Sequence, residues 1–167
     1  MNKKIVVGVV VLFVLIAFGV GYSLSKNNKD TPSNTSAPSN SMNVNGKSVD
    51  ISGQQLTALP ASVISQTDIV SLNASNNQLT ALPASIGNLV NLEVLNMENN
   101  RLVSLTSEIG KLTKLKSADF SNNRLESLPP ELGTLTNLES LNLDGYKGPR
   151  SDIDQLKQQL AHTNIKY

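Results

Sequence analysis

The chain has 167 residues, no cysteine and one histidine, and its formal net charge is +1. The lack of cysteine excludes a disulfide framework and thiol catalysis, and a single histidine leaves the common zinc sites short of ligands. A charge so close to neutrality gives no reason to expect a nucleic acid or another acidic polymer as partner.

The first predicted element is an apolar segment. Residues 5–25 contain no charged side chain, and a helix of that length spans about 30 Å, enough for a bilayer core. The lysines in residues 1–4 favour a cytoplasmic N-terminus with the rest outside, whereas Lys26 and Lys29 favour the reverse. We predict an uncleaved, single-pass signal anchor. The alternative is a cleaved signal peptide and a secreted protein, but its apolar stretch would be shorter.

A polar linker is predicted next. Residues 26–46 are rich in Ser, Asn, Thr and Pro and hold almost no large apolar side chain. Such a segment cannot bury enough surface to fold, so we expect a disordered tether with a reach of roughly 25 Å. The tripeptides Asn34-Thr35-Ser36 and Asn73-Ala74-Ser75 match the acceptor sequence for N-glycosylation.

Residues 47–167 are dominated by a 23-residue repeat. Its four copies and the segment after them open at Val49, Leu72, Leu95, Ala118 and Leu141. A period of this length is typical of a solenoid, in which stacking buries apolar residues that no coil can bury alone. The spacing of two in Leu72/Ala74 and Leu95/Met97 places each pair on one face of a short strand. Because every coil runs in the same direction, neighbouring strands are predicted to be parallel.

Two phrases of the repeat resemble the leucine-rich repeat family. The family phrase L-x-x-L-x-L-x-x-N-x-L occurs as Leu92, Leu95, Met97, Asn100 and Leu102. The phrase L-P-x-x-I-G-x-L occurs as Leu82, Pro83, Ile86, Gly87 and Leu89. The chain looks like the 23-residue subtype of many bacterial and plant proteins, although Thr106 replaces one proline. This resemblance implies an α/β solenoid with a parallel sheet on the concave face, an irregular or 3-10 convex arc and a C-terminal capping helix.

The 23-residue spacing also identifies the turn residues. Asparagines fall where each strand ends, at Asn77, Asn100 and Asn123. A side-chain amide there can bind backbone groups that the sheet leaves free, so we predict a structural asparagine ladder and no ligand site. Glycines at the outer arc, Gly87, Gly110 and Gly133, are predicted to permit a tight return of the chain. Ile64 replaces this glycine in the first copy, whose outer arc is therefore predicted to be irregular.

The repeat fails after Leu143, and a capping element is predicted. Ser151 is a good N-cap residue, and Ile153, Leu156 and Leu160 share one face at helical spacing. We predict a helix over about residues 152–160 that covers the last coil. A short terminal strand from Asn164 to Tyr167 is predicted to follow it.

The candidate site is the exposed face of the sheet, where the resemblance implies protein binding. The predicted partner-binding residues are Asp50, Val70, Asn73, Glu93, Asn96, Glu98, Lys116, Asp119, Glu139, Asn142 and Asp144. With Lys47, this face carries six carboxylates and two lysines, a net charge of −4. It holds no aromatic anchor, so we expect modest affinity for a protein or glycan partner. A basic row, Arg101, Arg124 and Lys147, follows the adjacent edge.

No catalytic, cofactor or metal residue is predicted. Gly110-Lys111-Leu112-Thr113 lacks the preceding glycine of a phosphate-binding loop and is part of the repeat. The favoured function is a monomeric, membrane-tethered, non-catalytic interaction module outside the cytoplasm. The alternatives are a structural spacer of the cell envelope without a specific ligand and a secreted repeat protein.

Overall fold

The computed structural model describes residues 46–167. The predicted N-terminal segment (1–4), the predicted membrane span (5–25) and all of the predicted linker except Gly46 lie outside the described residues. Within residues 46–167, no helix combines the length and the apolar character needed to cross a membrane.

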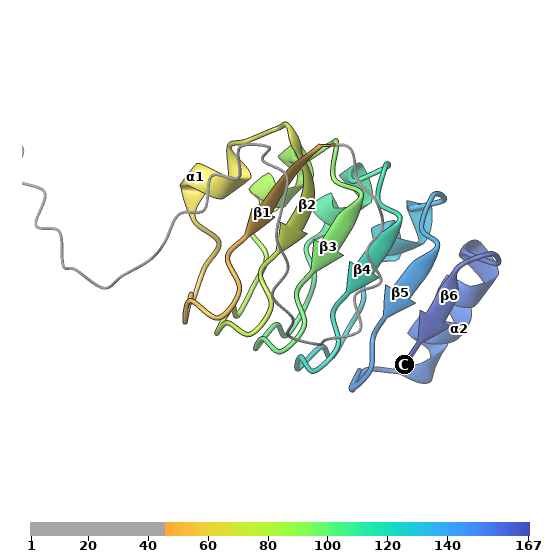
Figure 1. The fold of residues 1–167 in the computed structure, drawn as a ribbon. Helices are drawn as coiled ribbons and strands as arrows, with labels where there is room; N and C mark the ends of the chain where they lie inside the picture. The colour runs from red at the N-terminus through yellow and green to blue at the C-terminus, as the bar shows by residue number, and fades with distance from the viewer. Residues whose placement is uncertain (1–45) are drawn as a thin grey trace, which may run out of the picture. The chain divides into compact units, whose positions relative to one another are not determined.

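Six short parallel strands form one sheet in chain order (Figure 1). They are β1 (Lys47–Asp50), β2 (Ile69–Asn73), β3 (Val94–Asn96), β4 (Ser117–Asp119), β5 (Ser140–Asn142) and β6 (Asn164–Lys166). The register pairs Leu72 with Leu95, Leu95 with Ala118 and Ala118 with Leu141, so neighbouring strands are related by the 23-residue period. The predicted parallel sheet is confirmed.

Short helices form the layer opposite the sheet. Three of them are 3-10 turns, η1 (Ala84–Asn88), η2 (Ser107–Lys111) and η3 (Pro130–Thr134). Each follows a residue in extended conformation, which is Pro83, Thr106 or Pro129. Thr106 has φ −77° and ψ 149°, close to the values of the two prolines, so the copy without proline keeps its turn. The irregular arc predicted for the first copy is wrong, because Pro60 there precedes one α-helical turn, α1 (Ala61–Ile64).

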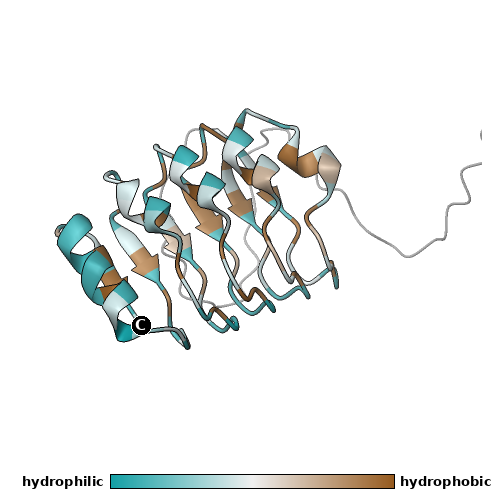
Figure 2. Cartoon of the chain, turned by 180° about the vertical axis from the view of Figure 1, so that it is seen from behind, coloured by the Kyte–Doolittle hydropathy of each residue, from teal (hydrophilic) through white to brown (hydrophobic). Residues whose placement is uncertain are grey.

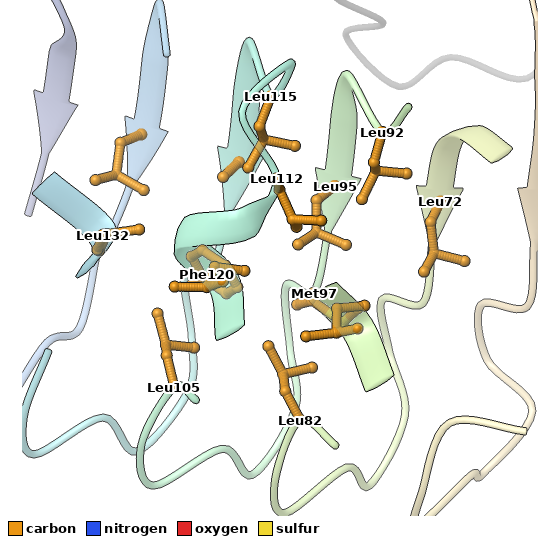
Figure 3. Packing of buried hydrophobic residues seen from close by; sticks show 14 of the residues in the cluster. Leu72, Leu82, Leu92, Leu95, Met97, Leu105, Leu112, Leu115, Phe120 and Leu132 are labelled. Carbon is orange, nitrogen blue, oxygen red and sulfur yellow. The ribbon is translucent and has the colours of Figure 1, made fainter. Parts of the chain in front are cut away.

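Apolar side chains fill the space between the two layers (Figure 3). Leu72, Leu95 and Leu141 are at most 1% exposed and point inward from β2, β3 and β5, and Ala118 does so from β4. Met97 and Phe120 are equally buried and fill the core where each strand ends. The predicted burial of apolar residues between stacked coils is therefore confirmed. Burying each large side chain stabilises the fold by about 1.5–3 kcal/mol.

A left-handed backbone conformation recurs where each coil leaves its strand. Five positions one period apart have φ between 55° and 87°, and they are Gly53, Asn76, Asn99, Asn122 and Gly145. Glycine and asparagine tolerate this conformation better than other residues do. The Asn-Asn pairs in the sequence carried this signal, but the sequence analysis assigned a role only to the second asparagine of each pair.

The outer-arc glycines have a different role from the one predicted. Positive φ among glycines occurs in the described chain only at Gly53 and Gly145, so Gly110 needs no special backbone conformation. A Cβ atom on Gly110 would lie 2.8 Å from Cβ and 3.0 Å from the carbonyl oxygen of Glu131 in the next coil. Glycine is required here because neighbouring coils approach each other closely.

Helix α2 (Arg150–Gln159) covers the last coil, as predicted. Ile153, Leu156 and Leu160 are buried at 1–3% exposure against the core. The remainder of the helix is largely hydrophilic, as the view from behind shows (Figure 2). The solenoid therefore ends in a polar surface, which a terminal cap must provide.

The predicted bounds of this helix need correction. Pro149, with φ −63° and ψ 139°, occupies the cap position, and Ser151 lies inside the first turn. The Pro149 carbonyl accepts a hydrogen bond of 3.1 Å from the Asp152 N–H, so the helix begins before the predicted residue 152. It ends at Gln159 because Leu160 leaves the helical conformation.

Candidate functional site

Most of the predicted partner-binding residues share one outward face of the sheet, which we call the sheet face. Its central row consists of Asp50, Asn73, Asn96, Asp119 and Asn142, one residue per coil. A side-chain oxygen of each accepts a hydrogen bond of 2.8–3.1 Å from the backbone N–H two residues later. Each of these residues thus closes a local turn at the end of its strand. This structural role was not assigned from the sequence.

The central row is also linked between coils. The Asn73 amide donates to Asp50 at 3.2 Å, and the Asn142 amide donates to Asp119 at 2.9 Å. Burial raises the pKa of Asp50, but hydrogen bonds from Ser52 and Asn73 outweigh it and hold the pKa below its ordinary value. Both carboxylate oxygens of Asp119 also accept hydrogen bonds. One accepts from the Asn142 amide, and the other accepts from the backbone N–H and the hydroxyl of Ser121.

Two ion pairs flank this row. Lys116 binds Glu93 at 2.8 Å, and this hydrogen bond raises the pKa of Lys116. Lys166 on β6 binds Asp144 at 2.8 Å, which raises the pKa of Lys166 and lowers that of Asp144. Lys166 was not predicted on this face because the repeat pattern does not extend to β6. The sheet face therefore carries six carboxylates and three lysines, Lys47, Lys116 and Lys166. Its net charge is −3 and not the predicted −4.

Few groups on the sheet face remain for a partner. Glu139 is exposed and makes no side-chain hydrogen bond or ion pair with any described residue. Glu98 is half-buried and accepts one bond of 3.2 Å from its neighbour Asn99. Val70 is also half-buried, and a Cβ atom on Gly46 would overlap its side chain, so the incoming chain lies against it.

Two serines that lie two residues after the central row are buried. Ser75 and Ser121 are each 4% exposed, because the chain turns inward immediately after the central row. Ala74 between Asn73 and Ser75 is fully buried, and the Asn73 amide already binds Asp50. The acceptor tripeptide at residues 73–75 is thus part of the folded sheet, and its Asn73 amide is engaged by Asp50.

The ladder asparagines, Asn77, Asn100 and Asn123, are 7–8% exposed. The side-chain oxygen of Asn100 accepts a hydrogen bond of 3.0 Å from the Leu79 N–H. Its side-chain N–H groups donate to the backbone carbonyls of Ala74 and Met97 at 3.0 Å each. Asn77 and Asn123 make equivalent bonds one coil earlier and one coil later. Each amide therefore joins two neighbouring coils.

A second set of polar links lies where the strands begin, and the sequence analysis missed it. The amides of Asn91 and Asn137 donate to the carbonyls of Thr67 and Thr113, at 2.9 and 2.7 Å. Lys114 occupies the same position in the coil between them and donates to Asn91 at 2.8 Å. The only sign of these links in the sequence is the recurrence of asparagine at Asn91 and Asn137, two periods apart.

The described chain holds a hollow of about 210 Å³ between η3 and α2. Leu128, Pro129 and Leu156 form part of its wall, together with Asp152. The Tyr146 hydroxyl donates to the Asp152 carboxylate, and burial together with this bond raises the pKa of Tyr146 well above its usual range. In residues 46–167, no three side chains of His, Asp or Glu are placed to hold a metal ion.

Together these features define a class of protein. A 23-residue coil, a parallel sheet with a polar outer face and buried asparagines between coils describe a repeat solenoid. The family model described as Leucine Rich repeats (2 copies) matches residues 67–110 and again 113–158, more than half of the chain. The chain belongs to the leucine-rich repeat family.

One solved structure similar to this chain is a leucine-rich repeat protein of Leptospira interrogans. The two share 37% sequence identity with a TM-score of 0.65, and the match covers 68% of this chain. This chain spans only 29% of that protein's length. No curated protein matches the chain.

Proposed function

We propose that residues 46–167 form a non-catalytic module that binds a protein partner through the sheet face. Repeats of this family generally mediate protein–protein interaction, and the chain carries two of the matched double-repeat units. The observation that carries the proposal is the contrast on the face. Four residues of the central row bond to one another in pairs, Asn73 with Asp50 and Asn142 with Asp119, and the flanking lysines are paired with carboxylates, whereas Glu98 and Glu139 keep carboxylate oxygens free.

This contrast favours binding because the face is already ordered. Side chains that are held by internal bonds lose little conformational entropy when a partner docks on them. The two free carboxylates then supply the charge that selects and steers the partner. Because the face lacks an aromatic anchor, we expect affinity in the micromolar range, about −8 kcal/mol. A glycan is the alternative ligand class.

We further propose that residues 5–25 tether this module to a membrane, with the repeats on the extracytoplasmic side. Support comes from the uncharged length of that segment and from the lysines before it. Protease treatment of intact cells tests the topology: the repeats should be cleaved or shed, and protection of the repeats would refute it. A mature N-terminus beyond residue 21 in the medium would instead identify a secreted protein.

The binding proposal is tested by crosslinking and capture with the full chain in its native membrane. The variant Glu98→Gln/Glu139→Gln removes the two free charges without touching the central row. Glu108→Gln/Glu131→Gln, on the outer arc, makes the same charge change and is the matched control. We expect about a tenfold loss of one specific partner with the first variant only. Equal recovery with both variants and the wild type would refute the proposal and favour an envelope spacer.

A further inference from the structure

Three cations recur one period apart on the turns that follow β3, β4 and β5, and we call them the basic stripe: Arg101, Arg124 and Lys147. All three are exposed. Their backbone N–H groups donate to Leu79, Leu102 and Leu125, the equivalent carbonyls of the preceding coils, at 2.9 Å in each case. The three residues therefore occupy the same position in consecutive coils, about 4.8 Å apart.

No stripe residue forms an ion pair in the described part of the chain. The ion pairs formed by residues 46–167 are Lys47–Asp68, Lys116–Glu93 and Lys166–Asp144, and none includes a stripe residue. Like charges on neighbouring coils repel one another, so the stripe does not stabilise the fold. Gln55 and Gln78 occupy the same position in the two earlier coils, which shows that the coil needs no cation there.

We infer that the basic stripe binds an acidic segment of the protein partner. This inference rests on the proposed function and adds the chemistry of the ligand. Exposed cations without internal partners are free to form charge-assisted hydrogen bonds to carboxylates, and arginine does so with two parallel bonds. Three such cations in a row match a run of aspartate or glutamate residues in an extended segment.

The surroundings of the stripe select a protein segment over a uniform polyanion. The adjoining sheet face carries a charge of −3, and Glu98 and Glu139 on it form no ion pair with a described residue. Glu126, also exposed, lies two residues after Arg124. A nucleic acid or an anionic lipid surface would be repelled there, because its charge is negative everywhere. A protein segment can place acidic residues on the stripe and basic residues over the sheet face, and so satisfies both surfaces.

The test uses the full chain in neutral detergent and two synthetic peptides of equal length, followed by fluorescence anisotropy. One peptide has a run of glutamates followed by a run of lysines, and the other contains only glutamate. We expect the mixed peptide to bind more tightly, and Arg101→Glu/Arg124→Glu to weaken its binding by about tenfold or more. Lys111→Glu/Lys114→Glu reverses two exposed charges away from the stripe and should leave the affinity within about twofold.

Several outcomes would overturn the inference. They are absence of binding by either peptide, equal loss in both variants, or tighter binding of all-glutamate peptide or anionic vesicles than of the mixed peptide. Circular dichroism of each variant shows whether it is folded; if the double reversal does not fold, Arg101→Gln/Arg124→Gln replaces it with the residue of the earlier coils. If the stripe variant still captures the native partner and Glu98→Gln/Glu139→Gln does not, the inference fails while the proposed function stands.

Discussion

Replacing Asn100 by alanine tests how the asparagine ladder holds the coils together. The substitution leaves the buried Leu79 N–H without an acceptor. The carbonyls of Ala74 and Met97 each lose one donor but keep a second, from Asn77 and Asn123 respectively. A buried, unsatisfied N–H costs about 1–3 kcal/mol, and the two shared bonds add less. We therefore expect the free energy of unfolding to fall by about 2–3 kcal/mol.

Urea denaturation of the full chain, followed by far-UV circular dichroism, measures this loss. With a slope of about 1–3 kcal/mol per molar urea, the midpoint should fall by roughly 1 M while the slope stays unchanged. Asn91→Ala is the control, because its amide binds the exposed Thr67 carbonyl, which water can reach, so its cost should stay below about 1 kcal/mol. Equal losses in the two variants would refute the reasoning that burial makes the ladder important.

Three further substitutions test other features. Gly110→Ala should lower the stability of the fold by about 1–3 kcal/mol, because the new Cβ meets the Glu131 backbone. Gly133→Ala should lower it less, because the new Cβ meets the flexible end of the Gln159 side chain. Thermal melting that gives the opposite order of stability would contradict this. Asn122 has φ 55°, so Asn122→Ala should cost about 1 kcal/mol in urea and Asn122→Gly much less; equal costs would count against a backbone origin. The raised pKa of Tyr146 keeps its hydroxyl protonated in the folded state, so stability present below the ordinary tyrosine pKa of about 10 is lost as pH rises above it. Tyr146→Phe should lose less stability between neutral pH and about pH 11, and an unchanged pH profile would contradict the assignment.

Much of the fold could be predicted because the same pattern of apolar residues recurs in each 23-residue coil. Leu72, Leu95, Ala118 and Leu141 recur every 23 residues, and their burial requires a parallel sheet with one shared core. The bounds of α2 were less predictable, because Pro149 and Ser151 are both good residues for a helix start and the sequence alone does not choose between them.

The site was predicted less well, and the reason is physical. Outward spacing places a residue such as Asp119 on the sheet face, but spacing does not reveal that Ser121 and Asn142 occupy its oxygens. Lys166 pairs with Asp144 across a strand that lies outside the repeat pattern. Which groups on a face remain free depends on side-chain contacts between coils, and these become visible only in three dimensions.

The ladder stops before the solenoid does. Asn123 is the last amide of the ladder, since Tyr146 stands at the next ladder position and its hydroxyl bonds to Asp152 of the capping helix instead. Coils joined by a buried ladder amide must open together, whereas β5, α2 and β6 can open without breaking a ladder bond. Fraying should therefore begin at the C-terminal end, with hydrogen exchange of β5 and β6 faster than that of β2 to β4.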